Sequence, residues 1–588
     1  MEPRAVTAPS PAALWRPRWR YEPAHLALYA ALLLVVGVLV VLPIASVLRG
    51  ALVDSGGFTL AHVARFFYTP LYLESLRNSL YAGLGATLLA SLLALPAAFL
   101  LGRYQFRGQA LLVTWLTVPL VIPPFVGAIG LNQALGRAGA LTLFLEDRLG
   151  VQFVAAEGLR GVILAHALHY FPFILLTVTN ALANVDPSLE EAAKVAGARG
   201  VRLLWRVTLP LVAPAYAAGA ILVFVRSTDD LGTPLILNVK NMLGPQAYFR
   251  ITTIAREDPD GYAISIVMLA LALVAVLLAT RLGQRREVAT LQTGARAAGR
   301  PLRGWGPRLL LAFSVLVGFL GLLPHLGVVL MSVSQVWSLT YLPTGYTLDH
   351  YAEILFRAPQ FVTNTLLYSA TAAGVAVAVA VGIAYLQHRG RVPAPGLLDF
   401  AATAPIAVPG VVLGIGFLRV FDRWTVPWLG VPLTALWLIF PMLYVARRLP
   451  YAVRATSAAM AQVHPTLEEA AAVCGARRWR TFRRVVLPLV LGGAVAAGVL
   501  VFVTAAVEFS ATVLLISRVE QSPLSYGIYL YAQSPRGRGA AAALGTVAVV
   551  LVAAFRYLRL PLVLAYLCAG VLAGPSGFGW IPDLAGTR

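Results

Sequence analysis

The sequence predicts an all-α membrane protein of about twelve transmembrane helices, arranged as two homologous halves of six helices each. Three observations lead to this prediction. Hydrophobic residues make up 59% of the 588 residues and charged residues only 12%, about half the charged fraction of an average soluble domain. Apolar stretches of about 20 residues, the length that crosses a bilayer, recur along the chain. One segment of the first half is repeated in the second. A soluble enzyme and a disordered chain are therefore excluded.

The apolar stretches divide the chain into segments. We expect a first half over 25–282 and a second half over 308–558, separated by a basic cytoplasmic linker at 283–307. A polar segment at 1–24 precedes the halves, and an additional apolar tail at 559–588 follows them. The expected spans are 26–48, 76–101, 110–133, 159–183, 211–237 and 260–282, then 308–333, 361–386, 396–420, 431–450, 488–515 and 538–556.

Arginines between the spans predict the orientation. The net charge is +21, and all but two of the 46 basic residues are arginine. The loop 446–487 carries eight arginines against two glutamates, and the segment after the second span carries Arg103 and Arg107. Short loops rich in arginine face the cytoplasm, which places the N-terminus there as well. This bias accounts for the basic balance, so we expect no nucleic acid as a partner.

Residues 190–210 are repeated at 468–488, with 13 of 21 positions identical at an offset of 278. Six spans separate the copies, so the halves share one orientation and form a parallel duplication. Each copy predicts a short helix, which a capping box can start at Ser188 or Thr466, followed by a glycine turn. We expect a second, basic helix to end at the Leu-Pro pair that closes each copy.

Upstream of this repeat, Asn78-Ser79-Leu80 corresponds to Asn364-Thr365-Leu366 at an offset of 286. Pro119 and Pro123 correspond to Pro405 and Pro409 at the same offset. The similarity between the halves therefore extends well beyond the repeated loop.

The repeated pattern of Glu-Glu-Ala-Ala, three residues, Gly and a final Leu-Pro resembles the EAA loop of the permease subunits of type I binding-protein-dependent ABC importers. The resemblance covers about 24–558 and implies the fold of those permeases. It also implies two copies of an ABC ATPase subunit, each docked on one loop, a periplasmic binding protein, and a bacterial inner membrane. The glutamates would contact arginines of the ATPase. The residues assigned to these coupling loops are Glu190, Glu191, Ala192, Gly197, Pro210, Glu468, Glu469, Ala470, Gly475 and Pro488.

The chain itself is not expected to bind ATP. Its two lysines, Lys194 and Lys240, lie outside any Gly-Lys-Ser/Thr loop of the kind that cradles phosphates. ATP and magnesium would therefore belong to the partner ATPase, and we expect no cofactor on this chain. No nucleophile–base set stands out, so an enzyme is not expected. His166 and His169 could share a metal ion, but such histidines are more often satisfied within a helix bundle, and we expect no metal site.

Two stretches resemble those of ferric-iron permeases, namely DDLGTP at 229–234 and EFSATVL at 508–514. Asp230 and Glu508 are equivalent at the offset of 278. A lone carboxylate at mid-bilayer costs about 2.5–3.5 kcal/mol, so Glu508 is expected to face a polar pathway near the axis between the halves. Hard oxygen ligands suit a hard cation. The pathway candidates are Asp229, Asp230, Thr233, Glu508, Ser510 and Thr512. The alternative is a set of packing or gating hydrogen bonds without substrate contact.

Ferric iron is thus the favoured cargo, and a thiamine, polyamine or phosphonate-type importer is the alternative. A secondary cation:proton antiporter is an alternative of another class, because residues 556–588 resemble the start of a monovalent cation:proton antiporter. They contain Leu-Pro-x-Val-Leu-x-Tyr-Leu-x-Ala-Gly and Gly-Pro-Ser-Gly. A secondary carrier has no ATPase to dock, so the two EAA loops argue against it. The tail is expected to derive from a gene fusion or a reading-frame accident, and the alternative is an idiosyncratic tail that lies against the bilayer.

Overall fold

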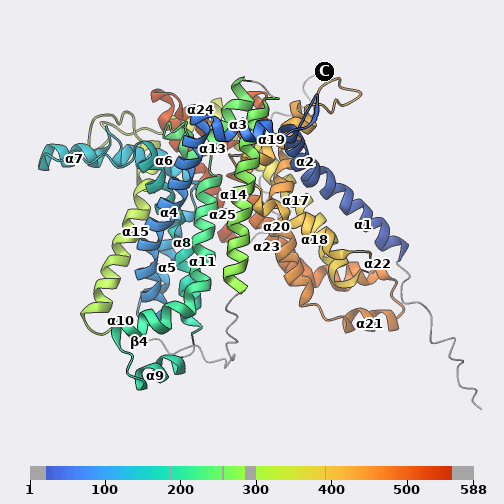
Figure 1. Cartoon of the computed structure of the whole chain (residues 1–588), viewed down its shortest axis with the longest axis horizontal. Helices are drawn as coiled ribbons and strands as arrows, with labels where there is room; N and C mark the ends of the chain where they lie inside the picture. The colour runs from blue at the N-terminus through green and yellow to red at the C-terminus, as the bar shows by residue number, and fades with distance from the viewer. Residues whose placement is uncertain (1–21, 186, 255–256, 285–299, 391, 559–588) are drawn as a thin grey trace, which may run out of the picture.

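The computed structural model describes residues 22–185, 187–254, 257–284, 300–390 and 392–558, and these residues are mostly helical (Figure 1). The predicted N-terminal segment and linker lie largely outside the described residues, and the tail at 559–588 lies entirely outside them. The domain boundaries therefore remain predictions.

The first half contains a series of long helices joined by short ones. Its helices are α1 (Pro23–Val36), α2 (Leu42–Leu52), α3 (Ala61–Tyr68), α4 (Pro70–Arg103), α5 (Gln109–Thr117), α6 (Pro124–Leu135), α7 (Ala140–Leu149), α8 (Gly158–Ala183), α9 (Pro187–Val195), α10 (Gly200–Leu203), α11 (Leu209–Asp229), α12 (Gly232–Ile236), α13 (Leu243–Phe249) and α14 (Pro259–Gln284).

The second half repeats this order. Its helices are α15 (Trp305–Ser332), α16 (Asp349–Ala352), α17 (Gln360–Arg389), α18 (Pro395–Thr403), α19 (Gly410–Phe421), α20 (Ile439–Ala461), α21 (Thr466–Val473), α22 (Arg478–Thr481), α23 (Leu487–Ala506), α24 (Leu524–Ala532) and α25 (Arg538–Leu558). Two small sheets complete the described chain: β1 (Val53–Asp54) pairs antiparallel with β2 (Gly57–Phe58), and β3 (Tyr104–Gln105) pairs parallel with β4 (Arg300–Pro301).

Nine helices in the described residues are long and apolar enough to cross a membrane, or up to eleven if two bent pairs each count as one span. The bent pairs correspond to the expected spans 110–133 and 396–420, which turn by 96° and 113°. The breaks occur at Pro123 and Pro409, where ψ is 143° in both halves. Successive prolines and the residue before a proline disfavour helix, which explains the break in spans that looked continuous.

The expected span 431–450 corresponds to α20, which begins at Ile439 and continues to Ala461. It is not among the nine because it carries Arg447, Arg448 and Arg454. Arg447 and Arg448 are buried in this helix. Assigning them to a cytoplasmic loop was therefore wrong.

The basic helices do not end at their Leu-Pro pairs, contrary to expectation. The π-helical segments Leu204–Thr208 and Phe482–Val486 lead directly into α11 and α23, so that each basic helix continues into its span. Proline lacks an N–H and clashes with the carbonyl of the preceding turn, and a wider π turn relieves this clash. The capping box at Thr466 is also absent, because α21 starts at Thr466 without a side-chain cap.

The first helix of each half packs on the other half. In Figure 1, α15 lies beside α4, α5 and α6, whereas α1 lies beside α18. The crossings depend on equivalent glycines, Gly130 and Gly416. A Cβ on Gly130 would overlap the carbonyl oxygen of Pro324, and one on Gly416 would lie 2.5 Å from that of Pro43. The two halves are therefore interlocked by close backbone contacts.

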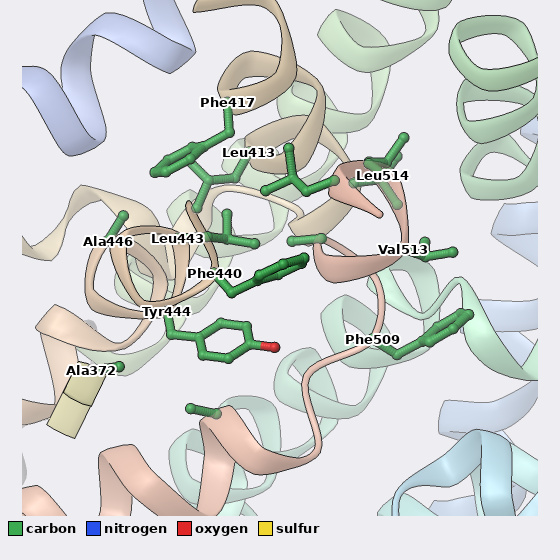
Figure 2. Close-up of a cluster of buried hydrophobic side chains, with 14 of the residues drawn as sticks. Ala372, Leu413, Phe417, Phe440, Leu443, Tyr444, Ala446, Phe509, Val513 and Leu514 are labelled. Carbon is green, nitrogen blue, oxygen red and sulfur yellow. The ribbon is translucent and has the colours of Figure 1, made fainter. Parts of the chain in front are cut away.

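A large apolar core surrounds the short segment that follows α23. Figure 2 shows side chains of α19 and α20 packed around this segment. Within it, the hydroxyl groups of Tyr444 and Thr512 lie 3.1 Å apart. The labelled residues are Ala372, Leu413, Phe417, Phe440, Leu443, Tyr444, Ala446, Phe509, Val513 and Leu514.

Candidate substrate pathway and coupling loops

The pathway candidates lie where α11 and α23 end. The expected spans 211–237 and 488–515 stop earlier, at Asp229 and Ala506. The carboxylate of Asp230 accepts the backbone N–H groups of Gly232 and Thr233, both at 3.1 Å. A carboxylate that accepts such N–H groups caps a helix and turns the chain, which explains the early end of α11 and the start of α12.

Arg447 connects the two halves at this point. Its Nη2 lies 2.7 Å from Asp229 of the first half, and its Nε lies 2.8 Å from Glu508 of the second half. The other oxygen of Asp229 accepts the backbone N–H of Gly410 at 2.6 Å. The guanidinium fork suits two carboxylates at once, so one buried arginine holds both acids in place.

Two further arginines extend this network. Arg448 binds Glu508 and donates to the carbonyl of Thr504 at 2.9 Å. Arg226 of the first half donates to the hydroxyl of Tyr451 in the second half at 2.5 Å. Glu508 is thus enclosed by positive charge and does not sit alone. Its arginine partners lie on α20, 60 and 61 residues before it in the sequence, so the apolar stretch around Glu508 does not contain them.

Asp230 has a different partner from its equivalent. Nε2 of His166 lies 2.9 Å from Asp230, and both side chains are buried. Among the described residues, no group of three or more His, Cys, Asp or Glu side chains could hold a metal ion. His166 is thus engaged with Asp230, and the second histidine of the motif, His169, lines the cavity described next.

Two cavities flank the arginine network. One of about 320 Å³ is lined by four pathway candidates, Asp229, Asp230, Glu508 and Ser510, and by three arginines. The other, of about 330 Å³, shares Arg226, Asp229, Arg447 and Arg448 with it. Three carboxylates therefore face three arginines at the boundary between the halves. The remaining candidates, Thr233 and Thr512, are buried outside both linings.

Ser510 also joins the halves, because its hydroxyl accepts the backbone N–H of Leu231 at 3.3 Å. Thr512 donates to the carbonyl of Glu508 at 2.9 Å.

The repeated Asn-Ser/Thr motif, at 78–79 and 364–365, binds the helices that follow the pathway residues, α13 and α24. Ser79 accepts the N–H of Leu243 at 2.9 Å, and Thr365 accepts that of Leu524 at 2.7 Å.

The two short helices of the coupling loops, α9 and α21, project from the same side of the helix bundle (Figure 1). The first glutamate of each loop binds an arginine of its own half: Glu190 binds Arg103, and Glu468 binds Arg389. Glu190 and Glu468 thus already have partners within this chain, and the contact of the four glutamates with an ATPase stays a prediction. The second glutamates, Glu191 and Glu469, are exposed, as are Ala192 and Ala470.

Each loop turns at a glycine with positive φ, 86° at Gly197 and 77° at Gly475. Apolar side chains stand exposed at equivalent positions on the two short helices. Val195 is 92% exposed and Val473 89%, while Leu189 and Leu467 are each 44% exposed. The two short helices therefore expose the same apolar positions in both halves. Pro210 and Pro488 each occupy the second position of the following helix, α11 or α23.

The family model described as a binding-protein-dependent transport system inner membrane component matches residues 94–288 and again 370–561. The chain belongs to this family. The two matches correspond to two halves, so the permease is a fused molecule located in an inner membrane. Because this family is not that of the cation:proton antiporters, the antiporter alternative is wrong for the matched residues.

Two curated relatives named for ferric transport match most of this permease, and a third matches about a third of it. The ferric transport system permease protein FbpB of Actinobacillus pleuropneumoniae is 25% identical over 83% of this chain and 71% of its own length. FbpB 1 of Haemophilus influenzae, also named for ferric transport, is 26% identical over 83% of this chain and 77% of its own length. The molybdenum transport system permease protein ModB of Escherichia coli is 35% identical over 32% of this chain and 86% of its own length.

Sequence reasoning missed the basic half of the pathway in this permease. Arg226, Arg447 and Arg448 were not identified as pathway residues, although all three line the cavity. One signal could have found two of them, because Arg447 and Arg448 lie within the expected span 431–450, and an ionisable residue inside a span indicates a functional site.

Proposed function

We propose that this permease moves ferric iron into the cell, with the energy supplied by a separate ATPase that hydrolyses ATP with magnesium. The observation that carries the proposal is the similarity to two ferric transport permeases over 83% of the chain. The three carboxylates of the cavity support it, because oxygen ligands suit a hard cation. A periplasmic binding protein would deliver the iron.

Two ATPase copies would dock on the two coupling loops, one on each. The exposed Val195 and Val473, together with Glu191 and Glu469, support this assignment because they present matching surfaces in both halves. In this proposal the loops lie in the cytoplasm. The N-terminus would lie on the same side, since Glu22 at the start of α1 contacts Arg478 of α22.

A second cargo deserves a test of its own because one observation favours it. ModB is 35% identical over its match, and arginines at the cavity suit an oxyanion such as molybdate. In this reading, Arg226, Arg447 and Arg448 would attract the anion, and the carboxylates would hold the arginines in position.

The experiment compares the two cargoes in one preparation. The permease, its ATPase and its binding protein are reconstituted in proteoliposomes, and ATP-dependent uptake of radiolabelled ferric iron and of radiolabelled molybdate is measured. Uptake of iron alone supports the proposal, whereas uptake of molybdate alone overturns it in favour of the oxyanion. The isolated permease is expected to show no ATP hydrolysis, and measurable hydrolysis without the second subunit would contradict a separate ATPase.

A further inference from the structure

The first glutamate of each coupling loop is tied to the end of the second long helix of its half. Arg103 is the last residue of α4, and Arg389 is the last residue of α17. Arg103 binds Glu190 through Nη2, and Arg389 binds Glu468 through Nε. The arginines are equivalent at the offset of 286 and the glutamates at 278. The same ion pair therefore occurs in both halves.

The pair in the first half is shielded from solvent. The side chains of Arg103 and Glu190 are 8% and 6% exposed, and Thr208 donates to Glu190 at 3.1 Å. The second pair is more open, at 13% and 22%, and the position equivalent to Thr208 is Val486. Screening by water weakens an exposed ion pair but hardly a buried one. Both pairs bind the loops, the first more firmly.

The helices α4 and α17 are also tied at their other ends. Ser79 on α4 accepts the N–H of Leu243, and Thr365 on α17 accepts that of Leu524. Leu243 and Leu524 begin α13 and α24, which follow the pathway carboxylates in the chain. In each half, 24 residues separate the anchor from the arginine, or about 36 Å of helix.

These two helices also support the helices that carry the pathway side chains. The most extensive contact between helices is that of α4 with α8 in the first half and that of the equivalent helices, α17 with α20, in the second half. His166 lies on α8, and Arg447 lies on α20. A continuous helix that is fixed at both ends and packed along its length can transmit a displacement of the loop to the pathway.

From this geometry, and resting on the proposed docking of an ATPase, we propose that Arg103 and Arg389 are positioning residues that fasten the coupling loops to α4 and α17. Each pair makes the movement of a docked ATPase pull on the helix and thereby on the pathway. Glu190 and Glu468 serve this internal attachment, whereas Glu191 and Glu469 face the partner.

The test measures conformational coupling without reference to the cargo. A reporter cysteine, Val507→Cys, is placed in the lining of the 320 Å³ cavity after Cys474→Ser and Cys568→Ser. Its rate of labelling by a membrane-impermeant maleimide is compared between the nucleotide-free complex and the complex trapped with ATP and vanadate. Arg103→Gln with Arg389→Gln is expected to reduce the trapping-induced change about tenfold while the ATPase still co-purifies.

Two further variants separate coupling from folding. Arg107→Gln is the matched control, because Arg107 is exposed and lies four residues after Arg103 in the sequence, and it should leave the trapping-induced change in labelling intact. The charge exchange Arg103→Glu with Glu190→Arg should restore most of the trapping-induced change in labelling that the glutamine variants lose. An unaltered labelling change in the doubly substituted permease, with the ATPase bound, overturns the proposal.

If the glutamine variants do not accumulate in the membrane, a cross-link replaces them. Arg103→Cys and Glu190→Cys are bridged by a reducible bis-thiosulfonate reagent in a permease that keeps Val507, because the reagent would also block a reporter thiol. The trapping-induced change in tryptophan fluorescence then replaces the labelling rate, and the bridge should preserve that change until it is reduced. Equal changes before and after reduction also overturn the proposal. Failure of the unmodified permease to bind an ATPase would instead overturn the proposed function, and it is recognised before any variant is compared.

Discussion

The guanidinium of Arg447 lies 2.7 Å from the carboxylate of Asp229, and the two residues belong to opposite halves of the chain. The same guanidinium lies 2.8 Å from Glu508. Arg447 and its neighbour Arg448 balance the negative charges of Asp229 and Glu508. The contact between the halves and the chemistry of the pathway therefore depend on the same side chains.

Arg447→Gln is expected to destabilise the permease by about 3–5 kcal/mol, because it leaves a buried carboxylate without its partner. Thermal unfolding of the detergent-solubilised protein measures the loss. Asp229→Asn added to Arg447→Gln should recover part of it, since Glu508 and Arg448 then remain as a balanced pair.

The control for this prediction is Arg423→Gln, which removes an exposed ion pair with Glu257. That change should cost about 0–1 kcal/mol. An equal loss of stability in the single and double variants at Arg447 would show that charge balance is not the cause.

Gly130→Ala and Gly416→Ala are each expected to destabilise the contact between the halves by about 1–3 kcal/mol, because the added methyl group overlaps a backbone carbonyl of the crossing helix. Gly374→Ala in α17 is the matched control, with nothing within 4 Å of the new Cβ. In a helix interior, this substitution should stabilise by up to about 1 kcal/mol. The melting temperature should fall for Gly130→Ala and Gly416→Ala and rise for Gly374→Ala. A change of the same sign in all three variants contradicts the prediction.

Gly197→Asp and Gly475→Asp are expected to reduce association with the ATPase and to uncouple transport, while the permease remains in the membrane. Both glycines have positive φ and open space around the Cβ position. The cost is therefore backbone strain of about 1–2 kcal/mol per site. Co-purification of the ATPase is the readout. Asparagine is the residue that replaces glycine at such helix ends, so Gly197→Asn should bind more ATPase than Gly197→Asp. Undiminished assembly and uptake in both aspartate variants would argue against docking at these loops.

Truncation after Leu558 is expected to preserve expression, ATPase association and uptake. The expected spans before this residue already form two matched sets, and the first half has no counterpart to the tail, because 283–307 is polar and basic. Membrane fractionation and co-purification check the outcome. A truncated chain that fails to insert or to assemble would make residues 559–588 part of the permease.

Much of the architecture could be predicted from the sequence alone. The spans follow from apolar length, the duplication from identities at a constant offset, and the turns at Gly197 and Gly475 from their place after a short helix. Each of these depends on neighbouring residues or on comparison of the chain with itself. The equivalence of Asp230 and Glu508 followed in the same way.

The tertiary structure alone decided which charges meet. Glu508 looked isolated in an apolar stretch, and Arg447 looked like part of a basic loop, because 61 residues separate them in the sequence. Asp229 is 218 residues from Arg447, and Glu190 is 87 from Arg103. The energy of an ion pair depends on distance in space and on burial. Neither can be read from charge counts along a chain, whereas hydropathy and repetition can be read there directly.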